Sequence, residues 1–234
     1  MKKLQKRIFN LGHLVIILFL GILLNQPTTP VFTQKKYVAL TYDDGPSQLT
    51  TKPLLKLLEK YGASATFFIN GNHANDYKDL VKEIYDNGNE IGNHTIDHVW
   101  LTKMSKEEVK RQIYGNESLL RFLSGQEGKM LVRPPYGDIN QEILDTYDLS
   151  FIMWSVDSRD WEVQDAAAIQ NNVFSNIQDG DIIIMHDGYT STIDATEDIL
   201  KRLNSEGFEV VSVSELFKIK NKKIPTHQKV SSCK

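Results

Sequence analysis

Five short polar clusters punctuate the chain, and each directly follows a stretch with the composition of a β-strand. In a parallel β/α architecture, the residues that follow the strands gather at one end of the sheet, and that end carries the chemistry. Carboxylates, histidines and an arginine that are distant in sequence are therefore expected to converge on one site. The clusters are residues 41–46 (TYDDGP), 94–98 (HTIDH), 133–137 (RPPYG), 157–161 (DSRDW) and 184–187 (IMHD).

Between the clusters, strand and helix patterns alternate. Leu54, Leu57, Leu58 and Tyr61 recur at helical spacing, and Gly62 is placed to end that helix. A later helix is expected to begin at the capping box of Ser105, and others are expected near residues 77–84, 139–147, 166–178 and 194–205. The expected strands are residues 37–42, 65–69, 90–93, 130–132, 151–156, 182–185 and 208–211.

About seven strands separated by helices predict an α/β fold with a parallel sheet. A closed or incomplete barrel is our first interpretation, and an open, doubly wound sheet is the alternative. The chain has no Gly-rich phosphate turn that would support a nucleotide site in such a sheet. A length of 234 residues suits a single catalytic domain, which we place at residues 35–217.

The formal net charge of −3 hides a strong asymmetry between the ends and the body of the chain. Residues 1–34 carry four basic side chains and residues 218–234 carry six, with no acids in either segment. Residues 35–217 therefore hold 17 basic and 30 acidic side chains. A body of this charge, without a basic run, is expected to repel nucleic acid and to suit neutral or cationic substrates.

The N-terminus has the layout of an export signal. Four basic residues precede an almost unbroken apolar run over residues 8–24, as in a cleaved secretory signal or a retained signal anchor. A small-x-small cleavage site is missing before Pro27, which favours the anchor, followed by a short linker to residue 34. We expect the body to lie outside the cytoplasmic membrane. A buried N-terminal core helix is the alternative, although such helices are seldom apolar on every face.

The C-terminal segment, residues 218–234, is rich in lysine and contains Pro225 and two serines. This composition predicts a solvated, disordered tail. Cys233 is the only cysteine, so no intrachain disulfide can form. Its simplest interpretation is an exposed thiol without a function.

His94 and His98 are four residues apart, which places both imidazoles on one side of a helical turn or tight bend. Two imidazoles and one carboxylate can bind a divalent cation and leave positions for water and substrate, and Zn²⁺ suits such ligands. The pair alone is weak support, because surface or core histidines give the same pattern. Three of the six histidines lie in the clusters, however, and Asp43 and Asp44 offer carboxylates.

The adjacent Asp43 and Asp44 fit a hydrolytic metal site, which needs one carboxylate as a ligand and another to take a proton from water. Carboxylates before a Gly-Pro pair are also ordinary turn chemistry. Arg133 gains significance if it pairs with one of them, because a cation keeps a carboxylate ionised and fixes its orientation. The rigid segment 134–137 can hold a backbone N–H toward a developing oxyanion.

His186 follows the apolar strand expected at residues 182–185. Its place at the strand end, rather than in the middle, favours a catalytic role over that of a core histidine. Asp157 or Asp160 could orient it and stabilise the imidazolium. Tyr136 and Trp161 are aromatic residues in the clusters and fit the walls of a groove on which sugar rings stack.

Taken in order, the five clusters resemble the motifs of the polysaccharide deacetylases of carbohydrate esterase family 4, the NodB-homology domain. The resemblance runs from Tyr37 to Phe217, nearly the whole body, and five ordered motifs are highly specific. It implies a distorted (β/α) barrel. It also implies metal-dependent removal of N-acetyl groups from glycans built on N-acetylglucosamine.

The resemblance further implies a role for each matching position. In the first three motifs, Asp43 matches the catalytic base, and Arg133 matches the arginine that holds it. Asp44, His94 and His98 match the metal ligands. Zn²⁺ is the expected ion, with Co²⁺ or another divalent ion as alternatives.

In the remaining motifs, His186 matches the general acid and Asp160 the aspartate that tunes it. Tyr136 matches the residue whose backbone N–H binds the oxyanion, while Trp161 and Ile184 match residues that line the substrate groove. Ile184 stands where leucine is commoner, a swap of similar volume. Tyr136 differs from the arginine expected in relatives that act on muramic acid, which favours N-acetylglucosamine.

The sequence thus predicts an exported or membrane-anchored hydrolase that releases acetate from N-acetylated glycans such as peptidoglycan or chitin-like polymers. Its expected partners are the glycan and, through residues 8–24, the cytoplasmic membrane; the sequence does not indicate an oligomeric state. One rival is a non-haem iron oxygenase, which also uses two histidines and a carboxylate. Another is a catalytically silent glycan-binding domain.

Overall fold

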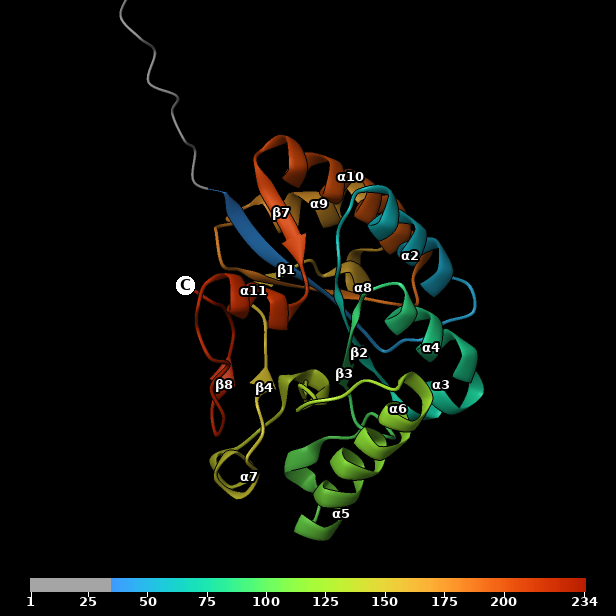
Figure 1. The fold of residues 1–234 in the computed structure, drawn as a ribbon, viewed down its shortest axis with the longest axis vertical. Coiled ribbons are helices and arrows are strands. Elements are labelled where there is room, and N and C mark those ends of the chain that lie inside the picture. Colours follow the sequence, from blue (N-terminus) through green and yellow to red (C-terminus); the bar gives the residue numbers. More distant parts are fainter. Residues whose placement is uncertain (1–34) are drawn as a thin grey trace, which may run out of the picture. The chain divides into compact units, whose positions relative to one another are not determined.

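Strands and helices alternate from Lys36 onward, as the sequence pattern predicts (Figure 1). The computed structural model describes residues 35–234. The expected signal or anchor within residues 1–34 lies outside this range. Among the helices of residues 35–234, none is both long and apolar enough to cross a membrane.

The main sheet is parallel, with strand order β3-β2-β1-β6-β5 and β7 paired to β1. The long strand β1 is its centre, because it pairs with β6 on its C-terminal half, with β2 at its C-terminal end and with β7 at its N-terminal end. The strands are β1 (Lys36–Asp43), β2 (Thr66–Ile69), β3 (Glu90–Asn93), β5 (Val156–Asp157), β6 (Ile182–His186) and β7 (Phe208–Val211).

Isolated β-bridges extend the sheet from β3 towards β5. Val132 pairs in parallel with Asn93 of β3 and with Phe151 of β4 (Phe151–Ile152), and the chain then runs on into β5, which pairs with β6. The strands therefore follow the path of a distorted barrel, and no continuous ladder closes it within residues 35–234. The prediction of a parallel α/β fold of the barrel type is confirmed.

Two expected strands are shorter than their sequence patterns suggest. The segment 130–132 contributes only the bridge at Val132, because the prolines that follow have no N–H to extend a ladder. The segment 151–156 divides into β4 and β5, since it changes partners along its length. Met153 N–H donates to Val230, whereas Ser155 N–H already donates to Ile182 beside β6.

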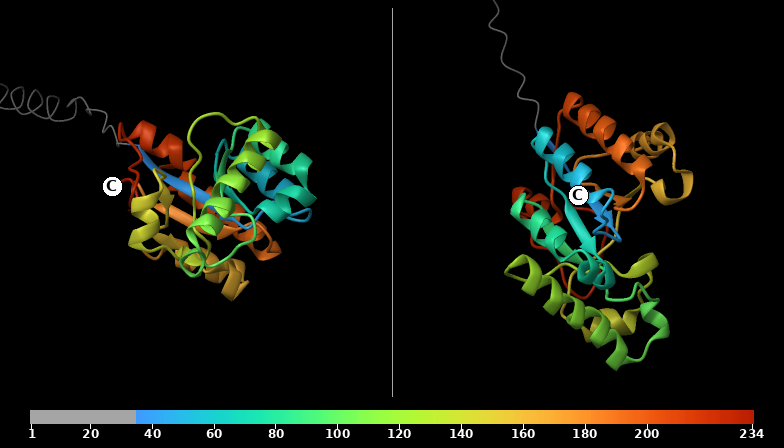
Figure 2. Two further views of the ribbon diagram at one scale, coloured as in Figure 1. Left: turned by 90° about the horizontal axis from the view of Figure 1, so that it is seen from below. Right: turned by 90° about the vertical axis from the view of Figure 1, so that its right-hand side faces the viewer.

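Helices lie on the outside of the strands, as the rotated views show (Figure 2). Side-chain oxygens cap the N-termini of α3, α5, α7, α9 and α11, which satisfies backbone N–H groups that have no helical partner. The helices are α2 (Thr51–Lys60), α3 (Gly71–Asp76), α4 (Lys78–Asp86), α5 (Lys106–Lys110), α6 (Asn116–Ser124), α7 (Gln141–Thr146), α8 (Asp160–Val163), α9 (Ala166–Phe174), α10 (Thr190–Ser205) and α11 (Val213–Ile219). A π-helical turn, Arg111–Gly115, joins α5 to α6.

The core surrounds β1 and β6, whose apolar residues face helices on one side and the barrel interior on the other. Val38, Leu40, Ile183 and Met185 are fully buried in a cluster that also includes residues of α2, α4 and α10. Strands that are buried on both faces have a continuous apolar sequence rather than an alternation of apolar and polar residues. This packing explains why the middle of each strand is apolar, while the carboxylate of Asp43 and the imidazole of His186 stand at the C-terminal ends.

The prediction of a disordered tail at residues 218–234 is wrong. Residues Lys229–Val230 form β8, which pairs with β4, and Val230 is buried. Cys233 is buried rather than exposed, and its N–H donates to the carbonyl of Gly180 at 2.7 Å. The expected domain boundary at residue 217 also falls inside α11. A few apolar residues are enough to attach this lysine-rich segment to the sheet.

Candidate active site

The sheet brings the five clusters to one end of the barrel, as the sequence predicted. Asp43 ends β1 and is paired in register with His186 at the end of β6. His94 directly follows β3, and Arg133 directly follows the bridge residue Val132. A cavity of about 410 Å³ opens between them, lined by Asp43, Asp44, His94, His98, Pro134, Tyr136, Gly137, Trp154, Asp157, Trp161, Ile184, His186 and Tyr189.

Asp44, His94 and His98 form a group that could hold a metal ion, because their ligand atoms all lie within 4.8 Å of one another. The Oδ1 atom of Asp44 is 3.4 Å from Nε2 of His94 and 3.2 Å from Nε2 of His98. Ligands bound tetrahedrally at about 2.0 Å are separated by about 3.3 Å. These residues therefore fit a divalent ion such as Zn²⁺.

The hydrogen bond of His94 and the lowered pKa of His98 both suit this role. The Nδ1–H of His94 donates to the backbone carbonyl of Arg133 at 2.7 Å, which leaves the Nε2 lone pair directed at Asp44. Burial lowers the pKa of His98, and the nearby His94 lowers it further, so the neutral ring is favoured. Neutral imidazoles are the form that binds metals.

Asp43 has a different environment from its neighbour Asp44. Its Oδ1 accepts a hydrogen bond of 2.7 Å from the guanidinium of Arg133, and both side chains are buried. Arg133 also donates to the Thr41 hydroxyl and to the carbonyls of Ile152 and Met153. Burial lowers the pKa of Arg133 and the Asp43 carboxylate opposes this fall. The two adjacent carboxylates thus point to different partners.

His186 and Asp160 form the second polar pair of the cavity. The Nδ1–H of His186 donates to Oδ1 of Asp160 at 2.7 Å, and the His186 backbone N–H donates to Oδ2. Burial alone would lower the pKa of His186, but the hydrogen bond and the charge of Asp160 raise it to about 9. Burial raises the pKa of Asp160, yet its hydrogen bonds, including one from Thr192, lower it overall. Asp157, the alternative partner for His186, accepts instead from the Arg159 N–H.

Exposed aromatic rings stand on the walls of the cavity. Trp161 is 50% exposed and Tyr136 is 54% exposed, and both line the cavity as predicted. Ile184 lines the floor and is nearly buried. Trp100, which the sequence analysis did not single out, stacks on Tyr136 with ring centroids 4.2 Å apart. Its position two residues after His98 is the one sequence signal that could have identified it.

The clusters hold their shape through unusual backbone conformations. Asp44, His98, Tyr136 and Arg159 have φ values of 70°, 53°, 61° and 53°, in the left-handed region that L-residues seldom adopt. Such conformations persist only where the surroundings enforce them, and they concentrate at functional sites. With Thr95 of the second cluster (φ 67°), five of the eight non-glycine residues with positive φ in residues 35–234 lie in the clusters.

A buried carboxylate behind the site, Asp187, belongs to the fifth cluster, but the sequence analysis gave it no role. Asp187 accepts hydrogen bonds from the hydroxyls of Thr50 and Thr51, and its N–H donates to the carbonyl of Asp43 at 2.8 Å. Burial raises its pKa to about 6. Any Cβ at Gly45 would overlap the Asp187 carboxylate, so this turn requires glycine. The contacts tie the turn after Asp43 to the end of β6.

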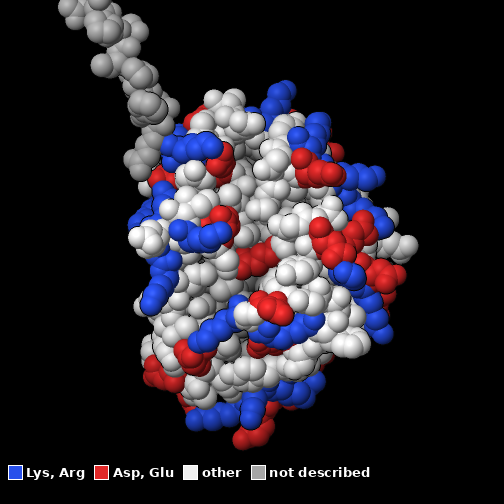
Figure 3. Space-filling model, viewed as in Figure 1, with Lys and Arg blue, Asp and Glu red and all other residues white. Residues whose placement is uncertain are grey.

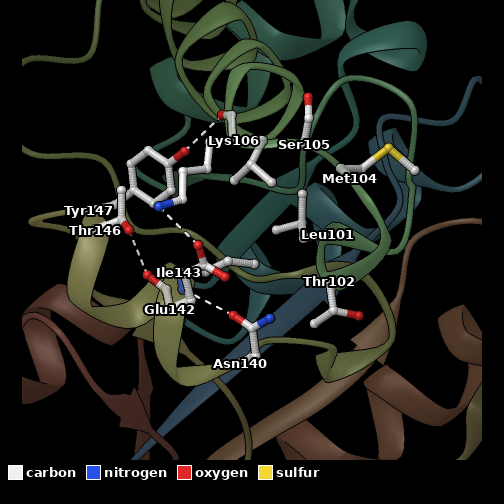
Figure 4. Close-up of a pocket in the computed structure, with 11 residues that line it drawn as sticks. Leu101, Thr102, Met104, Ser105, Lys106, Asn140, Glu142, Ile143, Thr146 and Tyr147 are labelled. Carbon is white, nitrogen blue, oxygen red and sulfur yellow. Dashed lines mark hydrogen bonds and ion pairs between the residues drawn. The ribbon is translucent and has the colours of Figure 1, made fainter.

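A second cavity, of about 270 Å³, lies between the segment 101–106 and α7 (Figure 4). An ion pair of 2.9 Å between Lys106 and Glu142 and a hydrogen bond from the Tyr147 hydroxyl to the Lys106 carbonyl connect its two sides. It shares no residue with the first cavity and contains no group of metal ligands. We therefore assign the chemistry to the 410 Å³ cavity.

Charges of both signs are interspersed over the face of the domain seen in Figure 3. Many exposed lysines and arginines pair with neighbouring carboxylates, as in the pair of Lys82 and Asp86 and the pair of Arg202 and Glu206. Such exposed pairs contribute little to stability. Blue and red groups lie next to one another at several places on this face.

A parallel β/α barrel with a two-histidine, one-aspartate group at the strand ends is typical of metal-dependent hydrolases. Comparison with known proteins agrees, because residues 31–149 match the family described as Polysaccharide deacetylase. The chain is 36% identical over 189 residues to the peptidoglycan-N-acetylmuramic acid deacetylase PdaC of Bacillus subtilis, covering 81% of this chain and 40% of PdaC. It is 35% identical over 202 residues to a peptidoglycan-N-acetylglucosamine deacetylase of Bacillus cereus, covering 83% of this chain and 94% of that protein.

The chain therefore belongs to the polysaccharide deacetylase family, as the five motifs indicated. It spans less than half the length of PdaC. The solved structure of PdaC has a TM-score of 0.77 at 37% identity, covering 80% of this chain and 93% of that one. A family 4 acetyl xylan esterase from Clostridium thermocellum, solved with a cobalt ion, has a TM-score of 0.79 at 30% identity, covering 84% of this chain and 98% of that one.

Proposed function

We propose that this protein is a metal-dependent hydrolase that removes N-acetyl groups from glycans containing N-acetylglucosamine, such as peptidoglycan or chitin-like polymers. The main support for the proposal is that two adjacent aspartates contact different partners. Asp43 pairs with the buried Arg133, while Asp44 faces the two imidazoles of His94 and His98. A base beside a metal ligand suits metal-assisted hydrolysis of an amide.

Asp43 acts as the base that takes a proton from the attacking water. The Arg133 guanidinium holds its Oδ1, so the second oxygen, 3.8 Å from Nε2 of His94, is the one that faces the metal group. A divalent cation held by Asp44, His94 and His98 would acidify the attacking water and polarise the acetyl carbonyl. Zn²⁺ fits these ligands best, and Co²⁺ is the ion that the related esterase carries.

His186 acts as the acid that protonates the leaving amine. Its Nδ1–H is engaged by Asp160, so Nε2 carries the proton that it donates. Asp160 keeps the ring protonated at neutral pH because it raises the pKa of His186. The backbone N–H of Tyr136, at the cavity wall, stabilises the oxyanion. The products are acetate and a glucosamine unit.

Tyr136 supports N-acetylglucosamine over N-acetylmuramic acid as the preferred sugar. Muramic acid carries an additional lactyl carboxylate, and the neutral Tyr136 ring at this wall offers that group no charged partner. Relatives of this chain are named for either sugar: PdaC for N-acetylmuramic acid and the Bacillus cereus protein for N-acetylglucosamine. Trp161 on another wall suits a sugar ring of either kind.

A substrate of this kind lies outside the cytoplasmic membrane, so the domain is proposed to act there. It is either attached to the membrane through residues 8–24 or released after cleavage of this segment. Four basic residues before the apolar run orient the N-terminus toward the cytoplasm. Protease added to wall-stripped intact cells is then expected to digest the domain. Protection of the domain until the cells are lysed would show that the orientation is wrong.

The activity is tested by measuring acetate release from acetylated chito-oligosaccharides, peptidoglycan and poly-N-acetylglucosamine. Residues 35–234 loaded with Zn²⁺ should release acetate from at least one, and the metal-free protein should not. Product analysis of peptidoglycan identifies which sugar has lost its acetyl group. Absence of acetate release from all three, by a folded protein with bound metal, would favour a silent glycan-binding domain.

A further inference from the structure

Metal-binding histidines normally donate their second ring N–H to a partner, which sets the tautomer and the ring orientation. His94 follows this rule through the backbone carbonyl of Arg133 at 2.7 Å. The corresponding atom of His98, Nδ1, lies 3.2 Å from the hydroxyl of Tyr136. The two histidines of the group therefore have different partners, one from the main chain and one from a side chain.

The Tyr136 hydroxyl contacts His98 at two atoms. It accepts from the Nδ1–H of His98 and lies 3.5 Å from the His98 carbonyl oxygen, to which it can donate. The two rings also pack edge to face, with centroids 4.6 Å apart. His98 has a φ of 53°, so its backbone depends on such contacts.

Trp100 packs against the Tyr136 ring. The two rings are nearly parallel, with an interplanar angle of 11° and a centroid separation of 4.2 Å. Trp100 is 42% exposed, and the amine of Lys103 lies 4.8 Å from its ring centroid. Trp100, Tyr136 and His98 thus form a continuous row of ring contacts, one stacked and one edge to face, that ends at the metal group.

We propose that the Tyr136 side chain is a positioning residue for the metal ligand His98, and that Trp100 acts through Tyr136. This role belongs to the hydroxyl and is separate from that of the Tyr136 backbone N–H. It deepens the proposed function, since it rests on Asp44, His94 and His98 binding a divalent ion. With the hydroxyl in place, Nδ1 of His98 keeps its proton and Nε2 remains free to bind.

The substitution Tyr136→Phe isolates the hydroxyl, because the aromatic ring and the backbone N–H remain. Loss of a partner of this kind typically weakens metal affinity 10- to 100-fold. We expect about a tenfold higher dissociation constant for Zn²⁺, measured on the purified full chain by competition with a chelator. The absorption spectrum of the Co²⁺-loaded variant should also differ from that of the wild type, because the orientation of His98 changes.

Tyr189→Phe is the matched control. Tyr189 lines the same cavity, and its hydroxyl forms no hydrogen bond to a ligand histidine within residues 35–234. Its Zn²⁺ affinity should equal that of the wild type. If Tyr136→Phe also binds Zn²⁺ as tightly as the wild type, with an unchanged Co²⁺ spectrum, the inference is wrong.

A double-mutant cycle tests the part played by Trp100. Trp100→Ala should weaken Zn²⁺ binding in the wild-type background and have little further effect in the Tyr136→Phe background, because the hydroxyl is already absent. Equal effects in both backgrounds would show that Trp100 does not act through the hydroxyl.

These measurements need no substrate, so the inference and the proposed function can fail separately. Acetate release with an unaltered Zn²⁺ affinity in Tyr136→Phe overturns only the inference. Tight Zn²⁺ binding that depends on the Tyr136 hydroxyl, without acetate release from any glycan, overturns only the proposed function.

Discussion

Arg133 donates a hydrogen bond of 2.7 Å to Asp43 at a depth where neither side chain is appreciably exposed. The two residues are 90 positions apart in the chain. Removing one partner of such a pair leaves an uncompensated buried charge, which typically costs about 3–5 kcal/mol of stability. Breaking the pair is therefore expected to destabilise the fold as well as to change the orientation of the expected base.

Asp44→Asn should lose much of the bound metal and, with it, the activity. A neutral amide is a poorer ligand than a carboxylate, and the two imidazoles would hold the dication alone. Elemental analysis of the purified variant measures the metal content beside turnover. Full metal occupancy and full activity in this variant would mean that Asp44 is not a ligand.

Asp43→Asn should keep the metal while its rate falls by about 10²–10⁴, the range expected for a lost general base. It should also be less stable in urea unfolding than the wild type, because Arg133 loses its counter-charge. Assays at a temperature where the variant is folded separate the two effects. A metal-free Asp43→Asn beside a fully loaded Asp44→Asn would reverse the two assignments.

Asp160→Asn should move the alkaline limb of the pH–rate profile to lower pH. Asp160 raises the pKa of His186 to about 9, so His186 stays protonated as the pH rises through neutrality. Without the carboxylate the pKa of His186 falls, and the acid loses its proton at a lower pH. Asp157→Asn is the control and should leave this limb in place. An unchanged limb in an active Asp160→Asn enzyme would remove Asp160 from this role.

Trp161→Ala should raise KM for a glycan substrate about tenfold with a smaller change in kcat, as expected when binding common to the ground and transition states is lost. Phe122→Ala is the matched control, since Phe122 is 85% exposed on α6 and lies outside the cavity. Its KM should not change. Equal KM values for both variants would show that Trp161 does not contact the glycan.

Val230→Ala should lower the free energy of unfolding by about 2 kcal/mol, the transfer free energy of two buried methyl groups. Lys229→Ala, on the exposed side of the same short strand, should change it by less than about 0.5 kcal/mol. Urea unfolding followed by fluorescence measures both. A Val230→Ala variant as stable as the wild type would mean that the C-terminal segment does not contribute to the core.

The sequence determined the parallel α/β fold, the approximate strands and helices, and the end of the sheet at which polar residues gather. These features depend on local periodicity, such as the apolar run before His186 or the helical spacing after Leu54, and local periodicity reports burial directly. The five clusters stand out because they interrupt these patterns at strand ends, and the resemblance of the ordered motifs then proposed roles for ten residues in them.

Only the tertiary structure decided which partner each of these residues has. Asp43 and Asp44 are neighbours with the same chemistry; the motif resemblance proposed different roles for them, and the contacts with Arg133 and with His94, far along the chain, supply the physical difference. The choice of Asp160 over Asp157 for His186 depends in the same way on how two strand ends meet.

The C-terminal segment and the stack of Trp100 on Tyr136 also depend on contacts across the fold. The lysine-rich composition predicted disorder. Val230 nevertheless lies in a short strand, β8, that pairs with the free edge of β4. A sequence pattern describes how a segment is buried, whereas partners are chosen by the three-dimensional packing of segments that are distant in the chain.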